Sequence, residues 1–434
     1  MPDEAKAVFA SGDGFFLSPD NPVATVDQRD AEALALRVMQ TPAVAEGRKN
    51  VEFQWRSVAG RHVSAQAWAL FDDMLTEYVF ANVLKAVNSD ANYPKVIGNY
   101  YGPPHEWFGL QVPGTRIGGD GPDTLYCAIP VDPHARLEIH GQWLEPRPAD
   151  FNANLFGAVS FRSTLEILTG RQLVTDCQGR FVITLDLQPA GGRSNHIKTR
   201  SDAKWLLIRQ TRSDWRQIPS AMRVRRLDPP TAPPISFEDI TQRAVEYMRD
   251  DVPNTYWWIA MSLALAPNTT SGPFKTSAVG GLVSQSAAFG RLVLADDDAF
   301  IITVGHGGAG FRDVVLLNYW YMTIDFGHHT SSFTNTQAMD NGDGTTTYVV
   351  SIKDPGLFNW LDPVGLHETH LVFRWQLIPP ATAPEGGPSL ETQLVKFDDL
   401  PKLLGGKLER VSTNERTRQL TQRMAEYQQR FVDR

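Results

Sequence analysis

The chain has 434 residues, which is too long for one ordinary domain and predicts two or three. Apolar residues make up 42% of the chain and charged residues 21%, so it can build large cores and is not of the disordered type. The net charge of −8 argues against a nucleic-acid binder, which would carry a basic face.

The cysteine content and the apolar windows bear on the cellular compartment. Cys127 and Cys177 are the two cysteines, and they make neither a disulfide framework nor a zinc ribbon. Residues 1–6 show no basic segment leading into an apolar one, so no secretion signal is expected, and the apolar window 256–266 is too short to cross a bilayer. The sequence therefore predicts a cytoplasmic protein without membrane or nucleic-acid partners, and leaves homo-oligomer formation open.

Residues 1–118 are predicted to form a helical region that ends in an aromatic loop. Asp30 is a candidate N-cap for the first helix, and a second helix is expected from about 64 to 88. The Gly/Pro-rich run that follows contains Tyr101 and Trp107. Aromatic loops of this kind serve as stacking platforms for sugars or flat apolar ligands, or pack at a domain junction.

The rest of the chain is predicted to be mainly β. Strand patterns with turn punctuation predict one β-sandwich over 119–228 and a second over 281–379. A Pro-rich linker and a helix capped by Ser236 occupy 229–280, and a linker with a polar C-terminal helix occupies 380–434. The predicted fold class is α+β, mainly β, with two jelly-roll-like sandwiches.

The two β regions share one order of features, which predicts an internal duplication. Each has a Gly-ended polar turn, a strand, a loop with Pro, an Asn, and a strand that carries an Arg. The Asn–Arg pairs are Asn195 with Arg209 and Asn359 with Arg374, separated by 14 and 15 residues. Self-similarity of this kind takes precedence over any single motif. The alternative is that any two β-sandwiches share such punctuation.

These residues also resemble a known group of proteins. Pro122, Asp123 and Tyr126, the run Asn359-Trp360-Leu361, and Arg374 are similar to an uncharacterised bacterial tandem β-sandwich family with an Asn-Trp-Leu loop and an Arg-bearing last strand. The first copy departs from the pattern, with His196 where the second has Trp360. The resemblance implies jelly-roll-like sandwiches and a bacterial origin, and it transfers no catalytic residue.

Polar and aromatic residues of the second β region are the candidates for chemistry. Arg374, among apolar neighbours on its strand, needs a partner carboxylate, a carbonyl or a bound anion. Residues 318–325 are expected to form a strand that places Tyr319, Tyr321 and Asp325 on one face, either lining a polar cavity or facing solvent.

Histidines offer two further candidates. His328 lies in a group with His329, His367 and His370, but their spacing does not match a zincin helix, so a metal ion is a minor alternative. His140 shares a strand face with Glu138, an arrangement that can tune a histidine for acid–base work or simply face solvent.

We therefore expect a small-molecule site in a cleft between the sandwiches. The favoured function is a cofactor-independent enzyme of hydrolase or lyase type, acting by acid–base chemistry on a carbohydrate-like or polycyclic molecule. The alternative is a non-catalytic binding protein using the same cleft. The expected catalytic residues are Asp325, Tyr321, His328 and Arg374, and the expected substrate-binding residues are Tyr319, Trp360, Asn359, Tyr101, Trp107 and His140.

Overall fold

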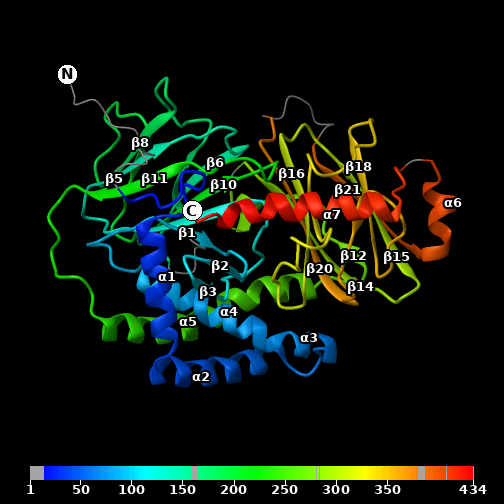
Figure 1. The fold of residues 1–434 in the computed structure, drawn as a ribbon, viewed down its shortest axis with the longest axis horizontal. Helices are drawn as coiled ribbons and strands as arrows, with labels where there is room; N and C mark the ends of the chain where they lie inside the picture. Colours follow the sequence, from blue (N-terminus) through cyan, green and yellow to red (C-terminus); the bar gives the residue numbers. More distant parts are fainter. Residues whose placement is uncertain are drawn as a thin grey trace.

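A computed structural model describes residues 14–158, 164–279, 281–282, 284–379, 387–406 and 408–433. The expectation of no signal at residues 1–6 and part of the predicted linker after 379 lie outside the described residues. The chain is α+β and mainly β, with a helical N-terminal region and a C-terminal helix, which confirms the predicted fold class (Figure 1).

The helices form a layer along one side of the molecule (Figure 1). Thr25, not Asp30, caps the first helix, because its side chain accepts from the Gln28 amide, so the prediction of Asp30 is corrected. Ser236 caps the long α5 as expected, in a capping box with Asp239. The layer consists of α1 (Val26–Met39), α2 (Pro42–Ala59), α3 (Ala65–Ala69), α4 (Phe71–Val87) and α5 (Phe237–Leu263).

The first β region consists of two sheets packed face to face around one apolar core. The sheet nearer the helices runs β1 (Ile97–Tyr100), β4 (Thr124–Pro130), β10 (Trp205–Thr211), β6 (Asp150–Phe156) and β7 (Thr164–Thr169). The outer sheet runs β11 (Ala221–Arg226), β5 (Leu137–Gln142), β8 (Arg180–Asp186) and β9 (His196–Lys198). The aromatic loop contributes β1 and a small hairpin of β2 (His105–Trp107) and β3 (Leu110–Val112).

The second β region repeats this arrangement around a core of its own. Its inner sheet runs β12 (Thr269–Thr270), β14 (Ser286–Val293), β20 (Glu368–Gln376), β16 (Phe311–Leu317) and β17 (Ser332–Thr334), with β13 (Phe274–Lys275) also paired to β14. Its outer sheet runs β21 (Ser389–Lys396), β15 (Asp298–Gly305), β18 (Thr345–Ser351) and β19 (Trp360–Leu361). From β4 to β11, each strand has its counterpart in β14 to β21, and both β8–β9 and β18–β19 are parallel pairs.

The inner sheets are buried on both faces, and this places the site. One face packs into its own sandwich core, and the opposite face packs against the helices in the largest core of the molecule. Leu207 on β10 and Val372 on β20 belong to that shared core. Arg209 and Arg374 follow two residues later on the same strand faces, because side chains alternate along a strand. Both arginines therefore face the junction of the two halves with the helices.

Residues 318–325 form a turn rather than the predicted strand. The Asn318 side chain accepts from the Trp320 amide at 2.9 Å, and Tyr321 has a φ of 63°, which lies outside the extended region of a regular strand. Trp320 is buried and donates from its indole to the Ala67 carbonyl at 2.7 Å, so it is anchored against the helical layer. The predicted alternation of faces is therefore wrong: Tyr319, Trp320 and Tyr321 are all buried.

The C-terminal segment links the two β regions. Two short helical pieces, η2 (Phe397–Asp399) and α6 (Leu400–Leu404), precede α7 (Thr413–Gln428), which runs along the second sandwich toward the first, and η3 (Gln429–Phe431) ends it (Figure 1). Arg423 on α7 donates to the Ser332 hydroxyl at 2.6 Å and lies over the ring of Trp215 at 4.3 Å. Among the residues described, no helix combines the length and the apolar character needed to cross a bilayer.

Candidate functional site

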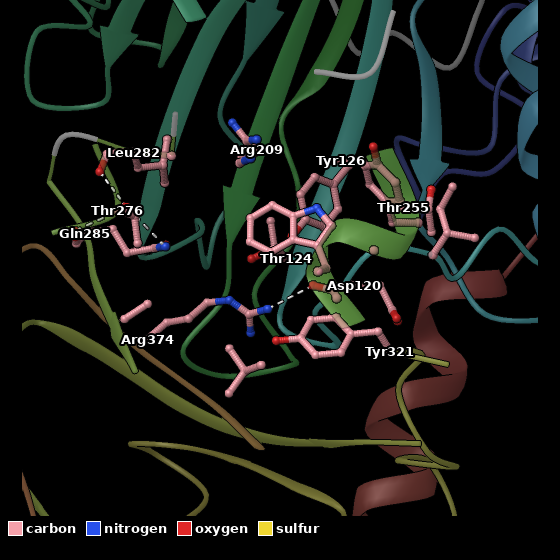
Figure 2. Close-up of a pocket in the computed structure, with 18 of the residues that line it drawn as sticks. Asp120, Thr124, Tyr126, Arg209, Thr255, Thr276, Leu282, Gln285, Tyr321 and Arg374 are labelled. Atoms are coloured by element: carbon pink, nitrogen blue, oxygen red, sulfur yellow. Dashed lines mark hydrogen bonds between the residues drawn. The ribbon is translucent and has the colours of Figure 1, made fainter. Parts of the chain in front are cut away.

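A cavity of about 180 Å³ lies where the two inner sheets meet α5 (Figure 2). Its walls come from the segment before β4, from β4 and β10 of the first half, from β14 and β20 of the second, and from α5. The turn that holds Tyr321 closes another side. Because each half contributes to the wall, the site exists only when both are in place.

Arg209 and Arg374, the repeated arginines, both line this cavity. Arg374 is locked in place: its Nη1 lies 3.0 Å from Oδ2 of Asp313, and its Nη2 donates to the Gly119 carbonyl at 3.0 Å. Burial raises the pKa of the Asp313 carboxyl, and the neighbouring Arg374 opposes that rise. Arg374 and Asp313 thus form an ion pair at the cavity edge.

Arg209 has a different environment. Its Nη1 donates to the side-chain oxygen of Asn154 at 3.0 Å, and its guanidinium lies 5.8 Å from the ring centres of Tyr126 and Phe156. Burial lowers the pKa of Arg209, and the positive charge of Arg374 lowers it further. Within the described part of the chain, no carboxylate lies within 4.0 Å of the guanidinium. A cationic donor therefore faces the cavity with no counter-ion among the described residues.

Asp120 and Tyr321 supply the groups that could move a proton. The Asp120 carboxylate accepts from the Thr323 amide at 3.0 Å and from the Thr323 hydroxyl at 2.6 Å. Burial raises its pKa to about 6, although Arg116 nearby pulls it down. The buried Tyr321 hydroxyl has no hydrogen-bond partner in the described residues, and burial raises its pKa above the ordinary value. An acid that titrates near neutral pH and a free phenol thus share one cavity.

The absence of a side chain at Gly119 leaves room for the ring of Tyr321 to lie against the backbone. Its φ is +81°, and a Cβ at that position would lie 2.8 Å from the ring of Tyr321. Its amide also donates to the Tyr321 carbonyl at 2.9 Å. A larger residue at 119 would displace the tyrosine from the cavity wall.

Aromatic side chains and a buried ion pair complete the lining. Tyr101 and Tyr126 meet edge to face, with ring centres 5.1 Å apart, and Trp258 of α5 adds an indole. Lys85 and Asp251 lie 4.0 Å apart and are almost fully buried. The cavity therefore combines flat apolar walls with a few charged groups, as small-molecule sites commonly do.

Of the residues predicted from sequence, Tyr101, Tyr321 and Arg374 line the cavity. Asp325 and His328 do not: they form an exposed pair, 2.9 Å apart, outside the lining. Tyr319 is buried beside His370, with ring centres 6.1 Å apart. The structure therefore separates Asp325 and His328 from the cavity that Tyr321 lines.

The other predicted residues serve the framework where the structure places them. Asn359 bonds the backbone of Met339, and the Trp360 indole donates to the Ser351 carbonyl at 3.0 Å. The Trp107 indole donates to Glu32 of α1. His140 bonds Glu138 at 2.9 Å on the outer sheet. The lining of the cavity includes none of these predicted residues, namely Asn359, Trp360, Trp107 and His140.

The histidines of the second half have separate partners. His329 bonds Asp362 at 2.8 Å, His367 bonds the Leu294 carbonyl at 2.8 Å, and His370 bonds the Ser262 hydroxyl at 2.7 Å. Burial lowers the pKa of His370 to about 4, so it is neutral. Over the ranges that the structure describes, no three His, Cys, Asp or Glu side chains gather as a metal site would require.

Arg209, Tyr126 and Asp120 line the cavity but were absent from the predicted set. Arg209 carried a signal, because it is the counterpart of Arg374 in the repeat. The sequence pointed to Tyr126 only through the family resemblance. No sequence signal pointed to Asp120, since its hydrogen-bond partner Thr323 lies 203 residues away in the chain. Contacts of that separation arise from the packing of the two halves.

Comparison with known proteins shows a similar fold in a solved structure. No protein-family model and no curated protein matches the chain. A crystal structure of an uncharacterised protein from Burkholderia cenocepacia is similar, with a TM-score of 0.67 and 22% identity over 84% of this chain and 100% of that one. The VPA0106 protein from Vibrio parahaemolyticus matches at a TM-score of 0.40 and 11% identity, over 74% of this chain and 98% of that one. The first likeness confirms that an uncharacterised bacterial protein shares the β-rich fold.

Proposed function

We propose that the chain is an enzyme that performs acid–base chemistry, of hydrolase or lyase type, on a small organic molecule held in the cavity between its two β-sandwiches. One observation carries the proposal: Asp120, with its pKa raised to about 6, lies in the same cavity as a tyrosine hydroxyl that has no partner among the described residues. A carboxyl group that titrates near neutral pH can both accept and return a proton. Asp120 takes the role first assigned to Asp325.

The other lining groups have roles that follow from their positions. Tyr321 donates a hydrogen bond to an oxygen that gains negative charge, and Arg374 lies close enough to influence the charge of that phenol. The volume limits the ligand, because a cavity of about 150 Å³ holds a benzene-sized molecule. A single ring with one or two substituents therefore suits this cavity of about 180 Å³ better than a polycyclic body.

A second candidate, a binding protein without catalysis, is favoured by a specific observation. Both carboxylate oxygens of Asp120 already accept hydrogen bonds from Thr323. A carboxylate held in this way can be a structural clamp between the two halves, leaving the cavity to bind a ligand only.

Substitution of Asp120 separates the two candidates. A panel of single-ring esters, lactones and hydroxy acids is incubated with the protein, and products are followed by chromatography while binding is followed by thermal shift. Catalysis predicts that Asp120→Asn keeps the thermal shift and lowers turnover by a factor of about 100 or more. Asp202→Asn, an exposed carboxylate paired with Arg200, is the matched control. Binding without turnover by the unmodified protein would favour the second candidate.

We also propose that the two halves arose by duplication within the bacterial tandem β-sandwich group that the sequence resembles. The equal strand orders and the equal positions of Asn195 and Asn359 support this. A cytoplasmic setting is supported by Cys127 and Cys177, which are free thiols. Analytical ultracentrifugation would decide whether the chain forms a homo-oligomer.

A further inference from the structure

Among the described residues of the cavity lining, Asp120 and Arg209 are the charged groups without an ion pair within 4.0 Å, and Arg209 is the cation of the two. Lys85 lies beside Asp251 at 4.0 Å, and Arg374 pairs with Asp313 at 3.0 Å. Behind Asp120, Arg116 forms an ion pair with Glu77. Arg209 is the arginine of this lining that has no carboxylate within 4.0 Å in the described ranges. An uncompensated cation in a partly buried position is costly unless an anion joins it.

The register of the strands shows why Arg209 has no carboxylate partner among the described residues. Arg374 on β20 lies opposite Asp313 on β16, and Arg209 on β10 lies opposite Asn152 on β6. Asn152 thus occupies the position that Asp313 holds in the second half. It carries no charge, and its amide nitrogen donates to Asp150 at 2.9 Å. A neutral amide at this position leaves the charge of Arg209 available to the cavity.

We infer that the ligand of the cavity is an organic anion, a single-ring carboxylate whose carboxylate binds Arg209, and that Asn152 determines this specificity because it places a neutral amide, not a carboxylate, opposite Arg209. The inference rests on the proposed function, because it names the class of molecule that the same cavity binds. A guanidinium donates parallel hydrogen bonds to the two oxygens of a carboxylate, which makes that group its best small partner.

The walls around Arg209 fit the rest of such a molecule. Tyr126 lies directly opposite Arg209 on the neighbouring strand, and Tyr101 meets Tyr126 edge to face. Trp258 lines the same cavity from α5. A ring bound by its carboxylate at Arg209 therefore has aromatic faces to pack against. Asp120 and Tyr321 line the same cavity, which allows chemistry on another substituent.

The test compares the binding of carboxylic acids with that of the corresponding amides. Each amide keeps the shape of its acid but carries no charge. Benzoate, 4-hydroxybenzoate and cyclohexanecarboxylate are compared with the corresponding amides by isothermal titration calorimetry and thermal shift on the full chain, with sodium chloride at equal ionic strength as a blank. At least one acid is expected to bind ten-fold or more tightly than its amide. Equal binding of acid and amide would overturn the anion inference and leave the cavity as a ligand site. Binding of neither would count against the proposed function as well.

Two variants test the residues. Arg209→Met is expected to weaken the binding of that acid ten-fold or more while leaving the binding of its amide unchanged. Arg136→Met is the matched control, because this exposed arginine pairs with Asp228 away from the cavity. Asn152→Asp keeps Arg209 but places a carboxylate opposite it, as in the second half. It should also weaken acid binding ten-fold or more, and unchanged acid binding in a folded Asn152→Asp protein would overturn the role of Asn152.

Discussion

The two halves of the molecule place an arginine at the same point of the same strand but give it different neighbours. In the second half Arg374 is bonded by Asp313 and by the Gly119 carbonyl. In the first half the position opposite Arg209 is Asn152, and the guanidinium bonds the neutral Asn154. Arg374 is bonded into the framework, whereas Arg209 keeps a charge directed at the cavity. Equivalent strand positions in the two halves thus give an arginine two different environments.

The loops that precede these strands show no such difference. The Asn195 side chain bonds the amide and the carbonyl of Val174, and the Asn359 side chain bonds the amide and the carbonyl of Met339. Each asparagine therefore fixes the chain before the Gly-ended turn of its own half. The halves agree where the framework is built and differ on the faces that meet at the cavity.

The largest expected effect is the difference in stability between variants of the two arginines. Arg374→Met leaves the carboxyl group of Asp313 buried without its partner, which typically costs about 3 kcal/mol or more in the free energy of unfolding. Arg209→Met removes a cation that has no counter-ion among the described residues, so the free energy of unfolding is expected to stay within about 1 kcal/mol of the parent or to rise. Urea unfolding of both variants measures the difference.

Equal losses in the two variants would show that Arg209 is as much a part of the framework as Arg374. Asp313→Asn with Arg374→Met in one chain is the control. With both charges gone, most of the lost stability should return, because the penalty comes from leaving one partner buried and alone.

Much of the fold could be predicted from the sequence because it depends on local patterns. Turn punctuation and alternating strands located both sandwiches, and Ser236 marked the start of α5. The prediction was wrong where a side chain changes the backbone. Residues 318–325 have the composition of a strand, but Asn318 bonds its own turn and Trp320 is anchored by the distant Ala67. A single sequence does not reveal that anchor.

The site could be predicted only in part for a related reason. Arg374, Tyr321 and Tyr101 were found from composition and local pattern, and all three line the cavity. Asp120 was missed, because its chemistry depends on burial and on Thr323 in the other half. Asp325 was preferred because it lies in an aromatic run, yet the turn leaves it exposed beside His328. Burial, which sets the pKa of a carboxyl group, follows from tertiary packing.

A second prediction concerns the carboxyl group at the junction of the halves. Burial raises the pKa of Asp120 from its ordinary value of 3.8 to about 6, so the folded chain favours the protonated form. The stability that this group contributes is then complete below about pH 4 and is lost as the pH rises through about 6. Asp120→Asn resembles the protonated form and lacks this dependence. As the pH rises from 4 to 7, the free energy of unfolding of Asp120→Asn minus that of the parent should increase by at most about 3 kcal/mol.

Urea unfolding at half-unit pH steps measures this gain, and Asp202→Asn serves as a control because its carboxylate is exposed. A constant difference between Asp120→Asn and the parent across this range would mean that the carboxyl group is not buried as described. The role of Asp120 as an acid near neutral pH would then lose its basis.

The smallest expected effect compares the two loop asparagines, where the halves agree. Asn359→Asp keeps the acceptor oxygen but loses the donors to the carbonyls of Met339 and Thr347, at a position that is 1% exposed. Asn195→Asp loses the donor to the Val174 carbonyl alone, at a position that is 8% exposed. We expect a loss of about 2 kcal/mol at 359 and about half of that at 195, measured by urea unfolding. Because both residues lie outside the cavity lining, both variants should bind the acid that binds the parent, and loss of binding in either would show that the framework and the cavity are coupled.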